Sequence, residues 1–148
     1  MKRHAFPLLQ ELLGLFPCVA LLGVRQCGKT TLLRELPPDW RRFDMEKLAD
    51  HEAIARDPDL FLRLNPNHVA IDESQLLPTL FPALRVAIDN DRESRGRFVI
   101  TGSSSPELLS SISESLAGRV AIIDMGPVSL AEAYELPPPP VPPMLAGR

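Results

Sequence analysis

A short run near the N-terminus has the residue types and the spacing needed to hold a polyphosphate. It matches the pattern GxxxxGK(S/T) and stands between an apolar run and a helical pattern, which is the context that supports this motif. Glycines let backbone N–H groups close around phosphate oxygens, and the start of a helix adds a favourable dipole. The residues predicted to contact a nucleotide are Gly23, Val24, Arg25, Gln26, Cys27, Gly28, Lys29, Thr30 and Thr31.

Two side chains at the end of this run have separate expected roles. Lys29 is expected to contact the β- and γ-phosphates of ATP, and the Thr30 hydroxyl is expected to ligate Mg²⁺. The alternative interpretation is a glycine turn that precedes a helix and holds no ligand.

Adjacent carboxylates, Asp72 and Glu73, follow the apolar run at residues 68–71. In sheets of parallel strands, ligands bind beyond the carboxyl ends of the strands. We therefore expect Asp72 to belong to the Mg²⁺ shell and Glu73 to orient the water that attacks the γ-phosphate. An acidic pair that merely caps a strand in solvent is the alternative. Glu73 favours hydrolysis, because an enzyme that transfers phosphate to a bound hydroxyl needs no base there.

Polar residues also follow the next predicted strand, at residues 98–101. We expect Ser103, in preference to Thr101, to sense the γ-phosphate, although a turn rich in serine and glycine is a common feature without that role. Arg119 comes after a predicted helix that ends near Gly118. An arginine there can reach the nucleotide of a neighbouring subunit, and an ordinary exposed arginine is the open alternative.

The elements that must position these side chains alternate along the chain, which is typical of the α/β class with a mostly parallel sheet. Strands are predicted at residues 18–22, 41–45, 68–71, 98–101 and 120–123. Helices are predicted around residues 8–13, 30–36, 46–64 in two pieces, 80–88 and 105–118. Asp57 and Ser105, each followed by proline, are the expected N-caps. The apolar face of the last helix is predicted to be Leu108, Leu109, Ile112 and Leu116.

Composition narrows the class of protein further. The chain has 148 residues, 45% of them hydrophobic, which suits a single domain. A formal net charge of -3 provides no basic field for nucleic acid, and no apolar stretch approaches the length of a membrane span. Pro7 and Glu11 interrupt any signal peptide, so we expect a cytoplasmic protein. Cys18 and Cys27 fit reduced thiols, and the histidines show no metal-ligand spacing.

Several motifs together resemble a branch of the AAA+ ATPases found in bacteria and archaea, over roughly Phe6 to Tyr134. The segments are LLGVRQCGKTTLL, HVAIDESQ, RFVITGSSSPEL and ESLAGRV. The resemblance implies a P-loop NTPase three-layer sandwich with a central parallel sheet in the order 5-1-4-3-2. It also implies a Walker A motif at residues 23–30, a Walker B motif at Asp72 and Glu73, and a first sensor near Ser103. Arg119 occupies the position of an arginine finger that acts in trans within a homo-oligomer.

Members of that branch carry a long C-terminal domain of uncertain function after the ATP-binding core. Here we expect residues 1–136 to form the core and residues 137–148, mostly proline, to be extended, so that the helical lid is missing. The leading hypothesis is an ATPase that couples Mg-ATP binding and hydrolysis to conformational change. The alternative is a truncated module that binds nucleotide without significant turnover. A small-molecule phosphotransferase is disfavoured because no acceptor site is visible, and the protein partner is not identified.

Overall fold

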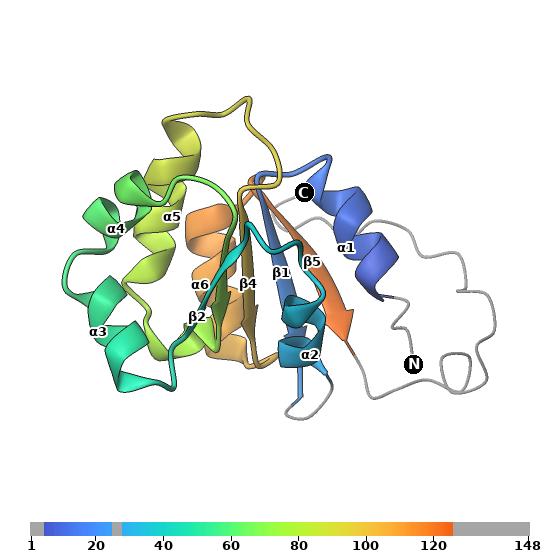
Figure 1. Ribbon diagram of the computed structural model, residues 1–148, viewed down its shortest axis with the longest axis horizontal. Coiled ribbons are helices and arrows are strands. Elements are labelled where there is room, and N and C mark those ends of the chain that lie inside the picture. Colours follow the sequence, from blue (N-terminus) through green and yellow to red (C-terminus); the bar gives the residue numbers. More distant parts are fainter. Residues whose placement is uncertain (1–4, 25–27, 126–148) are drawn as a thin grey trace.

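The computed structural model describes residues 5–24 and 28–125, which form a parallel five-stranded sheet between two layers of helices (Figure 1). The sheet order is β2-β3-β4-β1-β5, and every pair of neighbours is parallel. This confirms the predicted α/β class and the order 5-1-4-3-2. The strands are β1 Cys18–Gly23, β2 Arg41–Asp44, β3 Val69–Asp72, β4 Phe98–Gly102 and β5 Val120–Met125.

The helices divide between the two faces of the sheet. The helices α1 and α2 cover one face, and α3 to α6 cover the other (Figure 1). Their bounds are α1 Ala5–Leu13, α2 Lys29–Arg34, α3 Leu48–Ala55, α4 Pro58–Leu64, α5 Leu80–Asp89 and α6 Pro106–Leu116, with a 3-10 turn, η1, at Ser74–Leu76. Both predicted caps are present: the side chain of Asp57 accepts from Leu60 N at 3.1 Å, and that of Ser105 accepts from Leu108 N at 3.2 Å.

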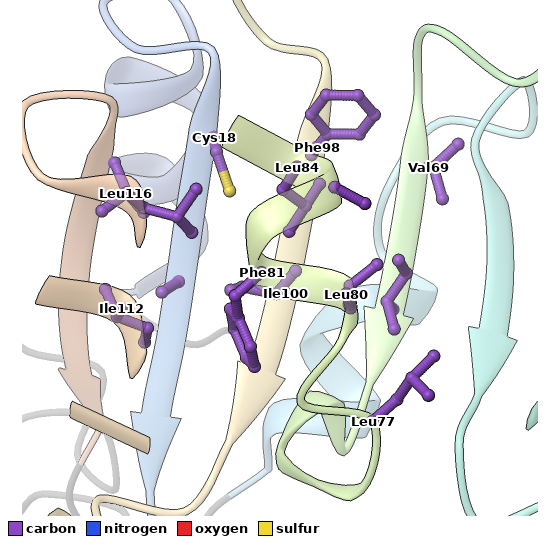
Figure 2. Close-up of a cluster of buried hydrophobic side chains, with 14 of the residues drawn as sticks. Cys18, Val69, Leu77, Leu80, Phe81, Leu84, Phe98, Ile100, Ile112 and Leu116 are labelled. Carbon is purple, nitrogen blue, oxygen red and sulfur yellow. The ribbon is translucent and has the colours of Figure 1, made fainter. Parts of the chain in front are cut away.

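Alternation along β1 divides the core in two. Cys18 and Leu22 face the cluster built with α5 and α6, whereas Val19 and Leu21 face the cluster under α1 and α2. Figure 2 shows the first cluster, in which side chains from α5 and α6 lie over the strands. Phe81, 1% exposed, is among its largest side chains, and its truncation to alanine should cost about 3–5 kcal/mol. The sheet is therefore anchored on both faces.

Strand register brings the predicted chemistry to one edge. Leu22 in β1 pairs with Gly102 in β4, and Ile71 in β3 pairs with Ile100 in β4. Because all strands are parallel, their carboxyl ends meet at the same edge, which holds Gly23, Asp72 and Gly102.

Some expectations differ from the structure. Leu109 is 39% exposed, so it does not belong to the buried face of α6; Leu108, Ile112 and Leu116 repeat every four residues on the inner side. The predicted strand at residues 68–71 begins one residue later, because His68 has a left-handed backbone with φ 60°. The predicted proline tail at 137–148 and the boundary at residue 136 lie outside the described residues. Within residues 5–24 and 28–125, no helix is long and apolar enough to span a bilayer.

Candidate nucleotide site

Gly28 connects the phosphate-loop sequence to α2. Its backbone is left-handed, with φ 94°, a conformation that glycine adopts without strain, and the helix begins at the next residue. Lys29 and Thr30 therefore stand in the first turn of α2, beside the carboxyl end of β1. Arg25, Gln26 and Cys27, predicted to contact the nucleotide, lie outside the described residues. Val24 is 60% exposed, and Thr31 is exposed on α2.

The ammonium group of Lys29 is held by backbone carbonyls at the carboxyl edge of the sheet. Its Nζ donates to Gly23 O at 2.7 Å, to Gly102 O at 3.1 Å and to Val24 O at 3.5 Å, and the residue is only 5% exposed. These partners are neutral acceptors from the ends of β1 and β4. A phosphate oxygen is a stronger acceptor for an ammonium group than a carbonyl, because it carries charge.

Thr30 and Asp72 meet across the sheet edge. The Thr30 hydroxyl donates to Asp72 Oδ2 at 2.7 Å, and Asp72 is 6% exposed. One hydroxyl and one carboxylate, both hard oxygen donors on rigid elements, fit the preference of Mg²⁺ for few protein ligands alongside water and phosphate. The donor set thus suits the metal that the sequence predicts at these residues.

Thr101 contacts both Asp72, the last residue of β3, and Glu73, which follows it. Its hydroxyl donates to Asp72 Oδ1 and accepts from the backbone N–H of Glu73 at 2.9 Å. Ser74 Oγ, fully buried, donates to the Thr101 carbonyl at 2.7 Å. Thr101 therefore fixes the ends of β3 and β4 relative to each other. Ser103, the predicted sensor, lies half-buried in the turn after β4, and within the described residues it donates to neither carboxylate.

Glu73 takes an unusual backbone conformation. With φ 57° and ψ 48° it is left-handed, which is uncommon for residues other than glycine and recurs at functional sites. Its Oε2 accepts from Gln75 Nε2 at 2.7 Å. No sequence motif predicts a role for Gln75, because no motif rule concerns the second residue after the acidic pair.

Arg119 lies away from Lys29. It directly precedes β5, so in a parallel sheet it stands at the edge opposite Asp72 and Gly102. Its Nε donates to Asp89 Oδ1 at 2.7 Å, a terminal nitrogen donates to Asp89 Oδ2 at 2.9 Å, and the other donates to Ala117 O at 2.9 Å. The hydrogen bonds from Arg119 hold the pKa of the Asp89 carboxyl below its ordinary value of 3.8.

The surroundings of Arg119 are concave and basic. A hollow of about 360 Å³ is lined by Arg119, Asp89, Arg92 and Arg95, together with apolar residues such as Phe16. The structure therefore brings together Lys29, Thr30, Asp72 and Glu73 at one edge and keeps Arg119 at the other. Within the described residues, no arginine donates to Asp72 or Glu73.

Comparisons with known proteins identify a family for this chain and a solved structure with a similar fold. The profile of the family described as AAA domain matches residues 16–134. The uncharacterized proteins Rv2008c of Mycobacterium tuberculosis and Mb2031c of Mycobacterium bovis are each 40% identical to this chain over 134 residues. Those residues amount to 88% of this chain and 30% of each relative, so the chain spans about a third of the length of these proteins.

A solved structure shares the fold. The crystal structure of a DNA replication initiation factor superposes with a TM-score of 0.54 at 12% identity, covering 87% of this chain and 46% of the other. At that level of identity the likeness concerns the architecture alone.

Proposed function

The chain belongs to the AAA domain family, and on that premise we propose that it binds Mg-ATP at the carboxyl edge of its sheet and hydrolyses it. Family membership makes it an ATPase-type nucleotide-binding module of the AAA+ superfamily. The hydrolysis, and its coupling to a conformational change in a partner or a further domain, are the proposal. The single observation that carries it is the meeting of Thr30 and Asp72, joined at 2.7 Å, beside the buried Lys29.

Lys29 is proposed to bind the β- and γ-phosphates. Its Nζ lies between the ends of β1 and β4 and has only neutral carbonyl partners there. Exchange of these partners for phosphate oxygens strengthens each hydrogen bond, because both groups are then charged. The buried position also limits competition from solvent.

Thr30 and Asp72 are proposed to hold Mg²⁺. When bound, this ion supplies positive charge that offsets the charge of the phosphate groups. Thr101 supports the arrangement, since its hydroxyl donates to the Asp72 oxygen that Thr30 does not occupy. The Asp72 carboxylate is thereby kept in one orientation, as a metal ligand must be.

Glu73 is proposed to accept a proton from the attacking water. Its backbone N–H is bound by Thr101 and its carboxylate by Gln75, so it projects from a fixed position next to Asp72. A carboxylate that is positioned in this way is suited to orient water, and general-base catalysis typically contributes about 10²–10⁴ in rate.

Arg119 is proposed to act on the nucleotide of an adjacent subunit. It lies at the opposite edge from Lys29, so its own nucleotide is out of reach, and it opens on a basic hollow at the surface. A homo-oligomer would let one subunit's Arg119 approach the site of the next.

A second candidate function is nucleotide binding without significant turnover. The pairing of Arg119 with Asp89 favours it for an isolated chain, because no arginine among the described residues then stands at the site to stabilise the transition state. The two functions share the same binding site and differ in the release of phosphate.

Calorimetric titration with ATP tests the shared part. We expect binding that strengthens when Mg²⁺ is added, since Thr30 and Asp72 then share the ion with the phosphates. The proposal would be refuted by a chain that circular dichroism shows to be folded and that does not bind ATP, either with or without Mg²⁺. Phosphate release from the same sample separates the ATPase from the binding module.

A further inference from the structure

We propose that Gln75 is a positioning residue that holds the Glu73 carboxylate in the orientation required for water activation, an inference that rests on the proposed function. The two side chains are joined by a hydrogen bond of 2.7 Å from Gln75 Nε2 to Glu73 Oε2. Gln75 belongs to η1, the 3-10 turn that starts directly after the left-handed Glu73. This turn folds the chain back and brings the amide to the carboxylate.

The chemistry of the pair permits only one orientation of the amide. The Gln75 nitrogen is a donor and faces an acceptor-only carboxylate, whereas the reverse orientation would oppose the amide oxygen to a carboxylate oxygen. Gln75 Oε1 consequently points inward, where it is buried and has no donor among the described residues.

The place of that oxygen is set by Gly102 at the end of β4. A Cβ atom at Gly102 would come within 2.7 Å of Gln75 Oε1 and within 2.3 Å of Leu108 Cδ2. The absence of a side chain at Gly102 therefore gives the Gln75 amide its room. The carbonyl of Gly102 also accepts from Lys29 Nζ at 3.1 Å, so the amide lies between Glu73 and the residue that contacts the phosphate-binding lysine.

A buried acceptor without a donor lowers stability, so packing alone does not account for an amide at this position. An apolar side chain of similar size would fill the same space without that cost. What only the amide provides is the hydrogen bond to Glu73. Thr101 fixes the Glu73 backbone and Gln75 fixes the Glu73 side chain, and together they leave the carboxylate little freedom to rotate.

The first test compares Gln75→Leu with wild type and with Gln10→Leu, a control on the exposed face of α1. For Gln75→Leu we expect kcat for ATP hydrolysis to fall by about tenfold or more, because the catalytic carboxylate is then loosely held. Affinity for Mg-ATP should stay within about twofold of wild type, and thermal stability should be unchanged or higher. A kcat within twofold of wild type would overturn the inference, as would a parallel loss of affinity and stability.

The variant Gln75→Glu supplies a readout that a merely structural role would not move. It replaces the donor by a second carboxylate of the same shape, which repels the Glu73 carboxylate instead of binding it. The kcat for ATP hydrolysis should fall at least as far as in Gln75→Leu, while KM for Mg-ATP stays within about twofold. A kcat within twofold of wild type in Gln75→Glu contradicts the inference.

A measurement without hydrolysis separates this inference from the proposed function. The side-chain amide of Gln75 donates to Glu73 Oε2, so its NMR resonances should shift and its hydrogens should exchange faster in Glu73→Ala than in wild type. These changes in a chain that never releases phosphate would refute the proposed hydrolysis and preserve the contact. Amide resonances that are the same in Glu73→Ala and in an active wild-type ATPase would overturn the role given to Gln75.

Discussion

Thr30 and Asp72 lie 42 positions apart in the sequence, yet the hydroxyl of one donates to the carboxylate of the other at 2.7 Å. This contact joins the first turn of α2 to the end of β3. It exists because β1, which precedes α2, and β3, which ends at Asp72, run parallel on either side of β4. The sheet order thus places α2, proposed to bind phosphate, beside Asp72, proposed to bind the metal.

Lys29→Ala is expected to abolish useful ATP binding. Hydrogen bonds between charged groups contribute about 1.5–3 kcal/mol each, so loss of the ammonium group should weaken affinity by about 100-fold or more. The control is Lys47→Ala, an exposed lysine at the start of α3. Calorimetry that finds equal affinity in wild type and Lys29→Ala would rule out the assigned site.

Asp72→Asn should remove most of the effect of Mg²⁺ on nucleotide binding. The substitution keeps the shape of the side chain and removes the charge, so the gain in ATP affinity on adding Mg²⁺ should fall by about 10- to 100-fold. Asp59→Asn, in the exposed first turn of α4, serves as the control. If titrations with and without Mg²⁺ give the same gain in ATP affinity for Asp72→Asn and Asp59→Asn, Asp72 is excluded from the metal site.

Arg119→Ala should leave ATP affinity nearly unchanged and lower turnover in the assembled protein, by roughly 10³–10⁵ if the arginine acts as a finger in trans. Turnover per subunit should rise with protein concentration in wild type. A mixture of Arg119→Ala and Lys29→Ala subunits should regain activity that neither variant shows alone, because some interfaces then pair an intact arginine with an intact lysine. Turnover that is independent of concentration and indifferent to Arg119→Ala would make this residue an ordinary surface charge.

Acid should weaken the contact between Asp89 and Arg119. The Asp89 pKa in the folded protein lies below 3.8, so the pair stabilises the fold above that pH and loses its effect as pH falls through the folded-state pKa. In urea unfolding, the stability difference between wild type and Asp89→Asn should be constant at neutral pH and shrink in strong acid. The same difference at every pH would contradict the pairing.

Much of the fold follows from local patterns. Short apolar runs predict the strands, and Asp57 and Ser105 before prolines mark two helix starts because each side chain caps the first turn. The order of the strands came from the resemblance to AAA+ ATPases and not from periodicity, which reports the face of an element but not its lateral neighbours.

Contacts between distant elements account for the features of the site that were not predicted from the sequence. The roles of Thr101 and Gln75 depend on how the end of β4 lies against the end of β3, and the pairing of Asp89 with Arg119 depends on where α5 ends relative to β5. Arginine side chains are mostly exposed in proteins, yet Arg97 is 3% exposed and donates to the carbonyls of Pro66 and Ala87. Burial of its guanidinium lowers the pKa of Arg97. Such long-range partners cannot be identified from the types of single residues in the sequence.

The most direct test of the account is steady-state phosphate release at saturating Mg-ATP by wild type and Glu73→Gln, with Glu107→Gln in the exposed first turn of α6 as the control. Glu73→Gln keeps the size of the side chain and its capacity to form hydrogen bonds, and it removes the carboxylate that accepts the proton. We predict that it binds Mg-ATP as tightly as wild type and releases phosphate about 10²–10⁴ times more slowly, whereas the control matches wild type. Two results would contradict the proposed hydrolysis. One is equal phosphate release by wild type and Glu73→Gln. The other is a wild-type chain that binds Mg-ATP but releases no phosphate at any protein concentration.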